Sequence, residues 1–390
     1  MRKTTIFQSA LLSTLIFSAS AVSAQDRISL APIGRIHVDG AIYAPDKDGF
    51  NDGASLPEIR AGVLAQYQNW MARIEIGYSY GVIGMKDVYI QRKFTSDDHL
   101  RIGYFIPQFG IRGGGSASHK PDMLPQNSES FFRTMTRKIG VGYTRFNSDY
   151  FLSGSAFVGG RSLTLTSTQQ GRVSVGGSLR GVWHPVTGEQ GTVQVGFSAS
   201  YETASHTQLI NDAGDEELSE GYRTYSCFFP TTVSKVPMLS AHIVDAVGDW
   251  KFSPELVLSK GCFALESQFY YMTVTRHKEL PSYNALGAYG MLRCLLLGDD
   301  NYSYSNAEGA LALPSPRTLE LVLGYDYTNA DSRKVGIDGG ISNDWSASLN
   351  YYINKYMAAR LRYSYTNVRN SAVSEPRGVN IIQARLQFVF

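Results

Sequence analysis

The chain has 390 residues, with 36 Lys and Arg against 34 Asp and Glu, and a formal net charge of +2. Nucleic-acid-binding proteins carry a strong basic excess, so this charge balance excludes that class of partner. Three cysteines, Cys227, Cys262 and Cys294, are too few and too widely spaced to indicate a disulfide framework.

The first 24 residues have the three parts of a secretory signal peptide. Arg2 and Lys3 form the charged start, an apolar stretch follows over 10–21, and "VSA" precedes Gln25 as a small-residue cleavage site. We therefore expect residues 1–24 to be a signal peptide and 25–390 to form one domain. Without Arg2 and Lys3, the exported part has 34 basic and 34 acidic residues and is formally neutral.

Alternation with a period of two dominates the rest of the chain. In "WMARIEIGYSY", residues 70–80, apolar Ile74, Ile76 and Tyr78 alternate with Arg73 and Glu75. Such alternation predicts a strand with one apolar and one polar face. These strands run to 9–12 residues and carry aromatic side chains near the ends of the apolar face, as in a wall that faces lipid. The pattern predicts an all-β, antiparallel transmembrane β-barrel.

The alternation predicts sixteen strands, an even number as in bacterial barrels. Their predicted ranges are 28–39, 57–67, 70–80, 85–94, 98–106, 138–146, 149–158, 172–183, 191–201, 252–259, 262–275, 284–297, 317–328, 343–353, 355–368 and 380–390. Short links such as 68–69 and long links such as 107–137 alternate, as periplasmic turns and outer loops do. The link 298–316 is long although it falls on the short side. We expect one or two of the long loops to fold into the lumen.

The last strand ends on the final residue. In "ARLQFVF", residues 384–390, Leu386, Phe388 and Phe390 share one face. An exposed edge of this kind is an aggregation hazard, so we expect this strand to close the barrel against the first. A terminal aromatic residue also resembles the signal that the outer-membrane assembly machinery recognises.

The sequence resembles the phosphate-selective porin O and P family. The similarity is carried in order by "IRAGVLAQYQNWMARIEIGY", "MKDVYIQRKF", "LRIGYFIPQFGI", "MLPQNSESFF", "RKIGVGYTR", "PELVLSKGCFALESQFYYMTV", "RTLELVLGYDYTN" and "WSASLNYYINKYMAARLRYSYTNV". The resemblance implies a sixteen-stranded homotrimeric porin in the outer membrane of a Gram-negative bacterium. It also implies loops that narrow the lumen and basic residues that attract anions such as phosphate.

The segment 107–137 is too long for a plain connection, and its glycines 113–115 allow it to fold inward. It has few acids, and its basic residues continue into the next strand: Arg112, Lys120, Arg133, Arg137 and Lys138. A few charges are effective at a constriction, because walls of low dielectric constant focus their field. We expect these five residues, with Arg60, Arg73 and Arg101 of the wall, to bind anions. A solvated outer loop that contacts lipopolysaccharide is the alternative for the segment.

Alternation also assigns lumen-facing charges along the wall. The basic set has eleven members: Arg35, Arg60, Arg73, Lys93, Arg101, Arg172, Arg180, Arg293, Arg360, Arg362 and Arg385. The acidic set has eight: Asp39, Glu58, Glu75, Asp87, Glu255, Glu266, Glu320 and Asp326. The bias toward anions is modest. Arg360 and Arg362 are placed on a wide, wet wall, where their replacement should matter little.

Other chemistry is not indicated. The loop "PDKDGFNDG" at 45–53 lacks EF-hand spacing, "GIRGGG" lacks the G-K-[ST] of a phosphate-binding loop, and the seven His are scattered. We expect no enzyme activity, cofactor or metal. The prediction is a porin for passive diffusion of small hydrophilic solutes, leaning toward anions. The alternative is a structural or adhesive barrel with a closed lumen, and the acidic segment 202–251 fits either an inward loop or a surface shield.

Overall fold

The computed structural model describes residues 27–390 except 114–116, 133–135, 160–170, 188–190, 205, 211–215, 219–220 and 278. The expected signal peptide, residues 1–24, and the candidate residue Arg133 lie outside the described residues.

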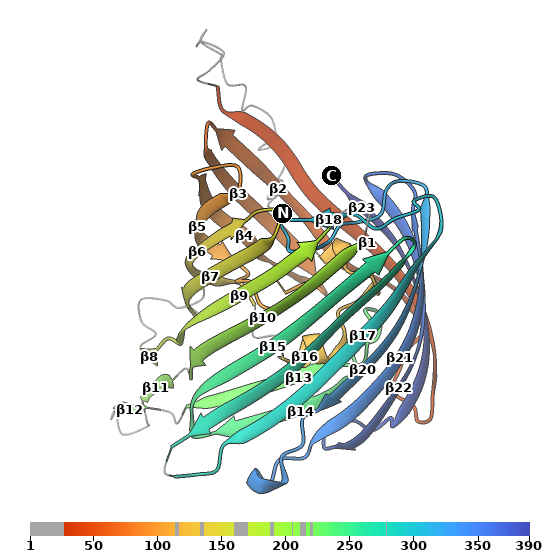
Figure 1. The fold of residues 1–390 in the computed structure, drawn as a ribbon. Coiled ribbons are helices and arrows are strands. Elements are labelled where there is room, and N and C mark those ends of the chain that lie inside the picture. Colours follow the sequence, from red (N-terminus) through yellow and green to blue (C-terminus); the bar gives the residue numbers. More distant parts are fainter. Residues whose placement is uncertain are drawn as a thin grey trace, which may run out of the picture.

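In the described part of the chain, sixteen antiparallel strands form a closed barrel (Figure 1). They are β1 Ser29–Pro45, β2 Gly53–Tyr67, β3 Trp70–Ser79, β4 Val82–Lys93, β5 Asp98–Phe105, β6 Lys138–Phe146, β7 Tyr150–Val158, β9 Val175–Val186, β10 Thr192–Thr203, β15 Ala246–Lys260, β16 Phe263–Arg276, β17 Tyr283–Leu297, β20 Thr318–Asn329, β21 Gly339–Tyr352, β22 Met357–Ser371 and β23 Gly378–Val389. The predicted barrel and its strand number are confirmed.

Several strand boundaries differ from the alternation pattern, among them those of β1, β15 and β9. β1 continues to Pro45, past a register shift between His37 and Asp39 that interrupts the alternation. β15 begins at Ala246, because the polar Asp249 and Lys251 point inward as an ion pair (3.6 Å) instead of marking a loop. Arg172 was assigned to the wall, but it belongs to the short strand β8 (Gly171–Arg172), which pairs with β11 (His206–Ile210).

The first and last strands close the barrel, as the C-terminal pattern predicts. β1 pairs with β23 in a register that runs from Arg35 opposite Val389 to Pro45 opposite Val379. Beyond this ladder, the Gly34 N–H donates to the Phe390 carbonyl (2.9 Å) and the Phe390 N–H donates to the Gly34 carbonyl (3.0 Å). The edge that the terminal strand would otherwise expose is therefore fully paired.

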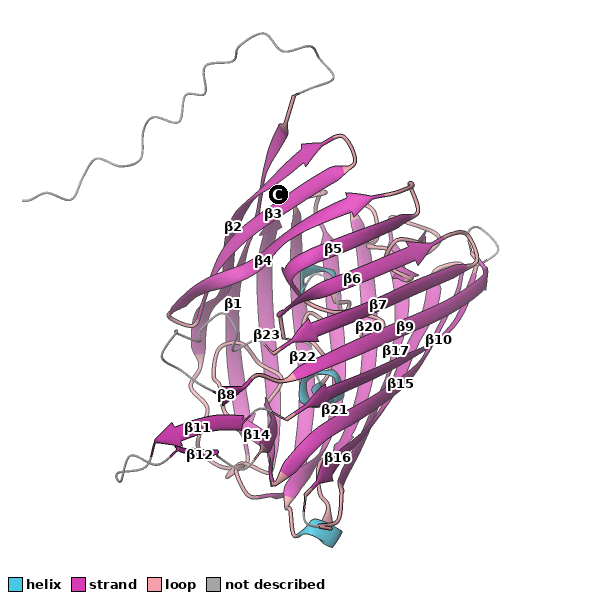
Figure 2. Ribbon diagram, turned by 90° about the vertical axis from the view of Figure 1, so that its left-hand side faces the viewer, coloured by secondary structure: helices cyan, strands magenta, loops and turns pink. Residues whose placement is uncertain are grey.

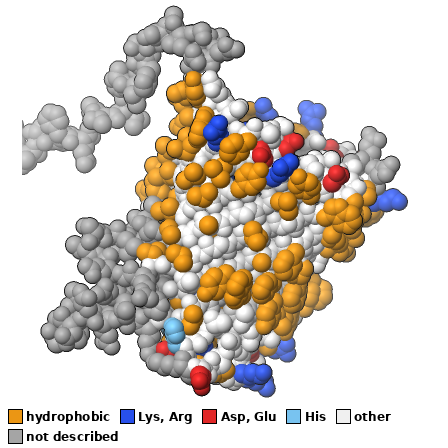
Figure 3. Space-filling view, turned by 60° about the vertical axis from the view of Figure 1, so that its left-hand side comes forward, with side chains coloured by type: hydrophobic (Ala, Val, Ile, Leu, Met, Phe, Trp, Pro, Cys, Tyr) orange, Lys and Arg blue, Asp and Glu red, His pale blue; other side chains and the backbone are white. Residues whose placement is uncertain are grey.

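The outer face of the wall is apolar. Side chains such as Ile74, Leu179 and Leu361 are about half exposed or more, while their sequence neighbours on the other face are buried or half-buried. Hydrophobic side chains cover much of the face seen in Figure 3, and charged residues lie near its upper and lower rims. No helix among the described residues is long and apolar enough to cross a membrane.

Shorter elements lie inside the ring of strands or at its ends (Figure 2). The helices are η1 Ala117–His119, α1 Asn127–Phe132 and η3 Arg333–Val335. The remaining strands are β12 Glu216–Leu218, the hairpin β13 Tyr222–Phe228 with β14 Pro237–Val244, and the pair β18 Tyr304–Ser305 with β19 Ala310–Leu311. The helix α1 contacts β13 and β20, and β14 contacts β21 and β22, so these two elements pack against one half of the wall.

Candidate functional site: a basic cavity beside an inner segment

The segment 106–137, here called the inner segment, is bound to the polar face of distant strands. Arg112 donates to Glu266 of β16 (2.9 Å), and Arg362 of β22 donates to Asp122 (3.2 Å). The Ser128 N–H donates to Asp326 of β20 (3.0 Å). These contacts place the inner segment against β16, β20 and β22, inside the barrel.

Arg360 and Arg385 fix the backbone of the same segment. Arg360 donates to the carbonyls of Ser118 (2.8 Å) and Lys120, and Arg385 donates to the carbonyl of Met123 (2.9 Å). The sequence pattern assigned Arg360 and Arg362 to a wide, wet wall, and that assignment is wrong. Both side chains are only 3% exposed, because the inner segment covers them.

Apolar packing fills the outer part of this half of the lumen. Tyr270 and Met272 of β16 face inward and are at most 3% exposed. The Tyr270 ring stacks on Phe132 of α1, with 5.5 Å between ring centroids. Phe131 and Phe132 of α1 and Leu239 and Ile243 of β14 join the same cluster. The segment 202–251 thus contributes the hairpin β13–β14 to the interior, which the sequence left open.

The link 298–317 enters the lumen from the end of the barrel that carries the short turns. Arg180 of β9 donates to the carbonyls of Glu308 (2.9 Å) and Gly309 (2.7 Å). Arg112 of the inner segment donates to the Leu311 carbonyl (3.3 Å). His119 lies 3.6 Å from Glu308, and its hydrogen bond holds the pKa of that carboxyl below its usual range. This long link therefore supports the inner segment from below, which accounts for its unusual length.

A cavity of about 400 Å³ remains between the inner segment and strands β1–β5. Seven Arg and Lys side chains line it: Arg35, Arg60, Arg73, Arg101, Arg112, Lys120 and Arg137. His119 and the carboxylates Glu75 and Asp87 line it too. We call it the basic cavity. It contains six of the eight residues that the sequence singled out for anion binding.

Carboxylates partner most of these cations. Arg35 and Arg60 lie directly opposite each other on β1 and β2, and Glu58 contacts both, at 3.7 Å from Arg35 and 2.6 Å from Arg60. Like charges on facing residues destabilise a sheet, so Glu58 is needed between them. Asp87 accepts from Arg137 (2.9 Å), and Glu75 accepts from Arg73 (3.3 Å).

The two cations of the inner segment are also paired. Burial alone would lower the pKa of Arg112, but the adjacent Glu266 raises it above the usual value, so the guanidinium stays charged. Lys120 donates to Glu129 of the same segment. With Glu58, Glu75 and Asp87, the carboxylates at the seven cations number five, so two positive charges remain in excess.

Arg101 differs from the other cations of the cavity. Its guanidinium donates to the Gln91 amide oxygen (3.0 and 3.2 Å) and lies over the Tyr89 ring, 4.3 Å from its centroid. Among the described residues it has no carboxylate within ion-pair distance. A guanidinium held by an amide and a ring keeps its charge uncompensated, which makes Arg101 the strongest candidate to contact an anion.

The other two predicted residues do not line this cavity. Lys138 at the start of β6 donates to Glu202 (2.7 Å), in a separate group that includes Arg223 and Asp249. Arg133 lies outside the described residues. Sequence reasoning placed Arg35, Glu58 and Asp87 in the lumen but did not identify them as parts of the site. The alternation of the sequence places these residues on the inner face, but it does not specify the strand register that brings them together.

Known proteins are similar to this chain in sequence pattern and in fold. A family model described as phosphate-selective porin O and P matches residues 34–390. OmpT, an outer membrane protein of Vibrio cholerae folded in vitro, has a similar structure, with a TM-score of 0.57, 9% identity, and coverage of 95% of this chain and 100% of that chain. Its trimer form gives a TM-score of 0.54 at 11% identity, covering 94% of this chain and 100% of that chain.

An anion-selective porin from Comamonas acidovorans is also similar, with a TM-score of 0.54, 10% identity, and coverage of 93% of this chain and 100% of that chain. At these identities the structural likeness shows a shared fold. No curated protein sequence matches the chain.

Proposed function

The chain belongs to the phosphate-selective porin O and P family, and on that premise we propose that it is an outer-membrane porin with a preference for anions. Small hydrophilic solutes diffuse through it passively, and phosphate or similar oxyanions are favoured. The observation that carries this proposal is the basic cavity, where seven cations meet five carboxylates beside the inner segment.

The excess positive charge of the basic cavity affects a passing ion because of where it lies. A wall of low dielectric constant on one side and the packed inner segment on the other focus the field of these residues on the remaining space. Screening at physiological ionic strength extends over about 8 Å, so only cations close to the path affect a passing ion. The planar fork of Arg101 matches an oxyanion, and its Tyr89 and Gln91 partners hold it without neutralising it.

The packing of α1 and β14 against β16 favours an ion path on the opposite side of the lumen, along β1–β5. The apolar cluster of α1, β14 and β16 fills part of its own side of the lumen. We infer that an ion crosses beside Arg60, Arg73 and Arg101, past the inner segment. Cations on the far wall, such as Arg293, are paired with Glu320 (2.7 Å) and hold the packing together.

The assembly is part of the same proposal. We propose a homotrimer in the outer membrane of a Gram-negative bacterium, exported by the N-terminal signal peptide and in contact with lipid and lipopolysaccharide. The apolar outer face and the existence of a trimer form of the similar OmpT support this. The C-terminal strand with Phe390 is proposed to be the segment that the assembly machinery recognises.

The substitution Arg101→Gln tests the proposed function. It removes the uncompensated charge and keeps a hydrogen-bonding side chain, so the anion preference in planar bilayers should fall. Block of the chloride current by phosphate should weaken as well. Arg333→Gln is the matched control, because Arg333 is exposed in the outer link 330–338. Equal anion preference and equal phosphate block in both variants would exclude the basic cavity as the filter.

A further inference from the structure

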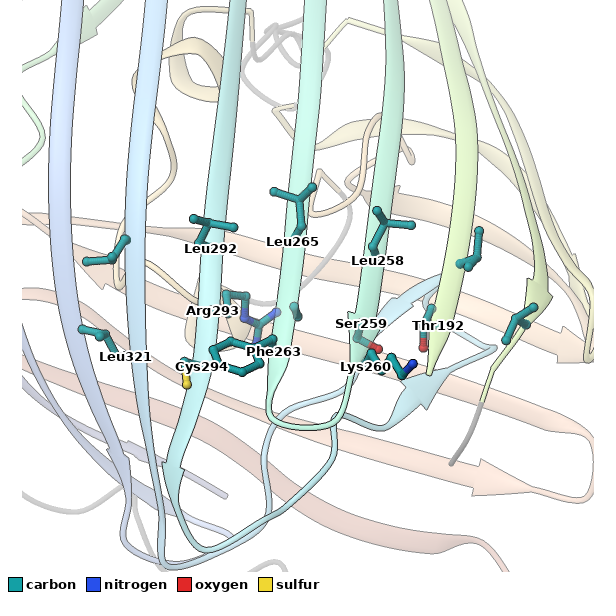
Figure 4. Close-up of a pocket in the computed structure, with 14 residues that line it drawn as sticks. Thr192, Leu258, Ser259, Lys260, Phe263, Leu265, Leu292, Arg293, Cys294 and Leu321 are labelled. Atoms are coloured by element: carbon teal, nitrogen blue, oxygen red, sulfur yellow. The ribbon is translucent and has the colours of Figure 1, made fainter. Parts of the chain in front are cut away.

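Cavities lie on both faces of the wall. The groove in Figure 4 crosses strands β10, β15, β16, β17 and β20, with Leu258, Leu265 and Leu292 on three of them. It is mainly apolar and opens on the side that faces lipid, away from the ion path. A smaller cavity of about 70 Å³ lies on the lumenal face, against β5, β6 and β7. We call it the hydroxyl cavity, and its polar lining consists of His99, Arg101, Gln108, Thr144, Ser153 and Ser155.

Three neighbouring strands bring the polar side chains of the hydroxyl cavity together in two rows. In the first row, Thr144 of β6 lies opposite His99 of β5 on one side and opposite Ser153 of β7 on the other. In the second row, two residues nearer the outer end, Arg101 of β5 and Ser155 of β7 lie opposite the same residue of β6. Residues that face each other, or that are two apart along a strand, share one face of a sheet. All five side chains therefore point into the lumen.

The two hydroxyls of the first row are buried on the lumenal face. Thr144 and Ser153 are 9% and 8% exposed, whereas their neighbours Tyr143 and Leu152 are 40% and 50% exposed on the outer face. The Thr144 and Ser153 hydroxyls lie 3.1 Å apart and form one hydrogen bond, in which either can be the donor. One of the two hydroxyl hydrogens therefore stays available to a third group.

Arg101 lines the hydroxyl cavity and the basic cavity alike. Its Nε and Nη2 donate to the Gln91 amide oxygen, which occupies two of the five N–H groups of a guanidinium. The remaining N–H groups have no hydrogen-bond partner among the described residues. Arg101 can therefore contact an ion in either cavity.

The hydroxyl cavity lies between Arg101 and the end of the barrel that carries the short turns. His99 follows the short turn 94–97, and Ser153 follows the short turn 147–149. Ala307, in the link 298–317 that enters from the same end, completes the lining. Short turns mark the periplasmic end of a barrel. An ion that moves from the basic cavity past Arg101 toward the periplasm therefore meets the hydroxyl cavity next.

The polar groups of the hydroxyl cavity can all donate hydrogen bonds, and no carboxylate of a described residue lines it. Gln108 adds an amide NH₂ group and His99 adds a ring N–H to the guanidinium and the hydroxyls. A tetrahedral oxyanion presents several acceptor oxygens, and hydrogen bonds to a charged acceptor are roughly twice as strong as neutral ones. A cavity of about 70 Å³ has room for a few water molecules. It therefore fits one small oxyanion and excludes a bulky organic acid.

We propose that the hydroxyl cavity binds one tetrahedral oxyanion, phosphate or sulfate, between the basic cavity and the periplasm. This inference rests on the proposed function and adds a second binding site to it. Arg101 supplies the positive charge. The hydroxyls of Thr144, Ser153 and Ser155 favour an oxyanion over chloride, because separate oxygens of one oxyanion can accept from both rows at once.

The test compares how phosphate blocks the chloride current of the protein in planar bilayers. A triple variant removes the hydroxyls and leaves every charge in place: Thr144→Val, Ser153→Ala and Ser155→Ala. The phosphate concentration that gives half-maximal block should rise about tenfold, because the bound anion loses hydrogen bonds. The zero-current potential in a potassium chloride gradient should stay as in the wild type, because no charge has changed.

The matched control removes three other hydroxyls of the lumenal face: Ser200→Ala, Ser259→Ala and Ser342→Ala. These hydroxyls are buried without a partner among the described residues and lie outside the hydroxyl cavity. The control should keep the phosphate block of the wild type, because the cavity is intact.

A second variant tests the space of the cavity and applies even if the triple variant does not fold. Gly142 faces Arg101 and Ser155 in the register, and a Cβ there would lie 3.1 Å from the Ser155 Oγ and 3.1 Å from the Phe105 ring. Gly142→Ala should narrow the cavity and weaken the phosphate block with every hydroxyl in place. Unaltered block in both variants, or an equal loss in the control, would overturn the proposal while leaving the anion preference intact. A wild-type potential that shows cation preference would instead overturn the proposed function, and this site with it.

Discussion

Glu58 determines how much positive charge the basic cavity presents. It is the carboxylate shared by Arg35 and Arg60, which face each other across β1 and β2. Glu58→Gln should therefore increase the preference for anions, the opposite of Arg101→Gln. It should also lower the free energy of unfolding by about 1–3 kcal/mol, because Arg35 loses its carboxylate partner and Arg60 keeps only Glu75 (3.2 Å). Bilayer recordings and thermal unfolding in detergent measure the two effects.

The control for this variant is Glu279→Gln, in the outer link between β16 and β17, where the side chain is exposed. If Glu58→Gln and this control gave the same anion preference, the ion path would not pass the Arg35–Arg60 pair.

Arg362 stabilises the protein through its contact with the inner segment. It donates to Asp122 (3.2 Å) and to Asp344 (2.8 Å), and all three side chains are buried. Arg362→Gln leaves two buried carboxylates without their cation, which should cost about 3–5 kcal/mol. The unfolding temperature, read from heat-modifiable mobility on gels, should fall clearly. Arg369→Gln, exposed on the same strand, should leave it unchanged. Equal unfolding temperatures would show that the inner segment is not held by this contact.

At the scale of a strand, the outer face of β22 should not tolerate a charge. Leu361 is 48% exposed on the apolar outer face. Leu361→Lys should destabilise the barrel by about 2–4 kcal/mol near the bilayer midplane. Val373→Lys, in the outer link 372–377, should cost little, because Val373 lies beyond the strand end. Folding titrations in lipid vesicles compare the two, and an equal cost would contradict the assignment of the outer face.

The terminal strand makes a separate prediction. Phe390 completes the pairing of β23 with β1 through its backbone, and its ring is 44% exposed beside Phe388. Deleting Phe390 should lower the amount of folded protein in the outer membrane and leave synthesis and export unchanged. Phe94→Ser, which removes another exposed aromatic residue at the same end, is the control. Normal levels of heat-modifiable protein after the deletion would reject the proposed recognition signal.

The elements of the wall were predictable because alternation is a local property of the sequence. Arg73 and Glu75 could be placed on the inner face from their immediate neighbours alone. The interior was not predictable in this way. The contact of Arg362 with Asp122 joins residues 240 positions apart, and no local pattern specifies it. For the same reason Arg101 was identified as one cation among several, and only the structure shows that no described carboxylate pairs with it.

At the scale of the whole molecule, the interior is divided. The half lined by β15–β22 is packed with the inner segment, α1 and the hairpin β13–β14, and the half lined by β1–β5 contains the basic cavity. Residues 25–390 have 34 basic and 34 acidic side chains and are formally neutral, so any preference between ions must come from this local arrangement. Selectivity should also weaken at high salt, because the screening length falls from about 8 Å at 0.15 M to about 3 Å at 1 M.

The zero-current potential of the wild-type protein in a potassium chloride gradient tests this central claim most directly. A single channel in a planar bilayer, with dilute salt on one side and tenfold more on the other, is sufficient. A potential whose sign corresponds to faster passage of chloride than of potassium is the predicted result. A potential of the opposite sign, showing preference for potassium, would contradict the account.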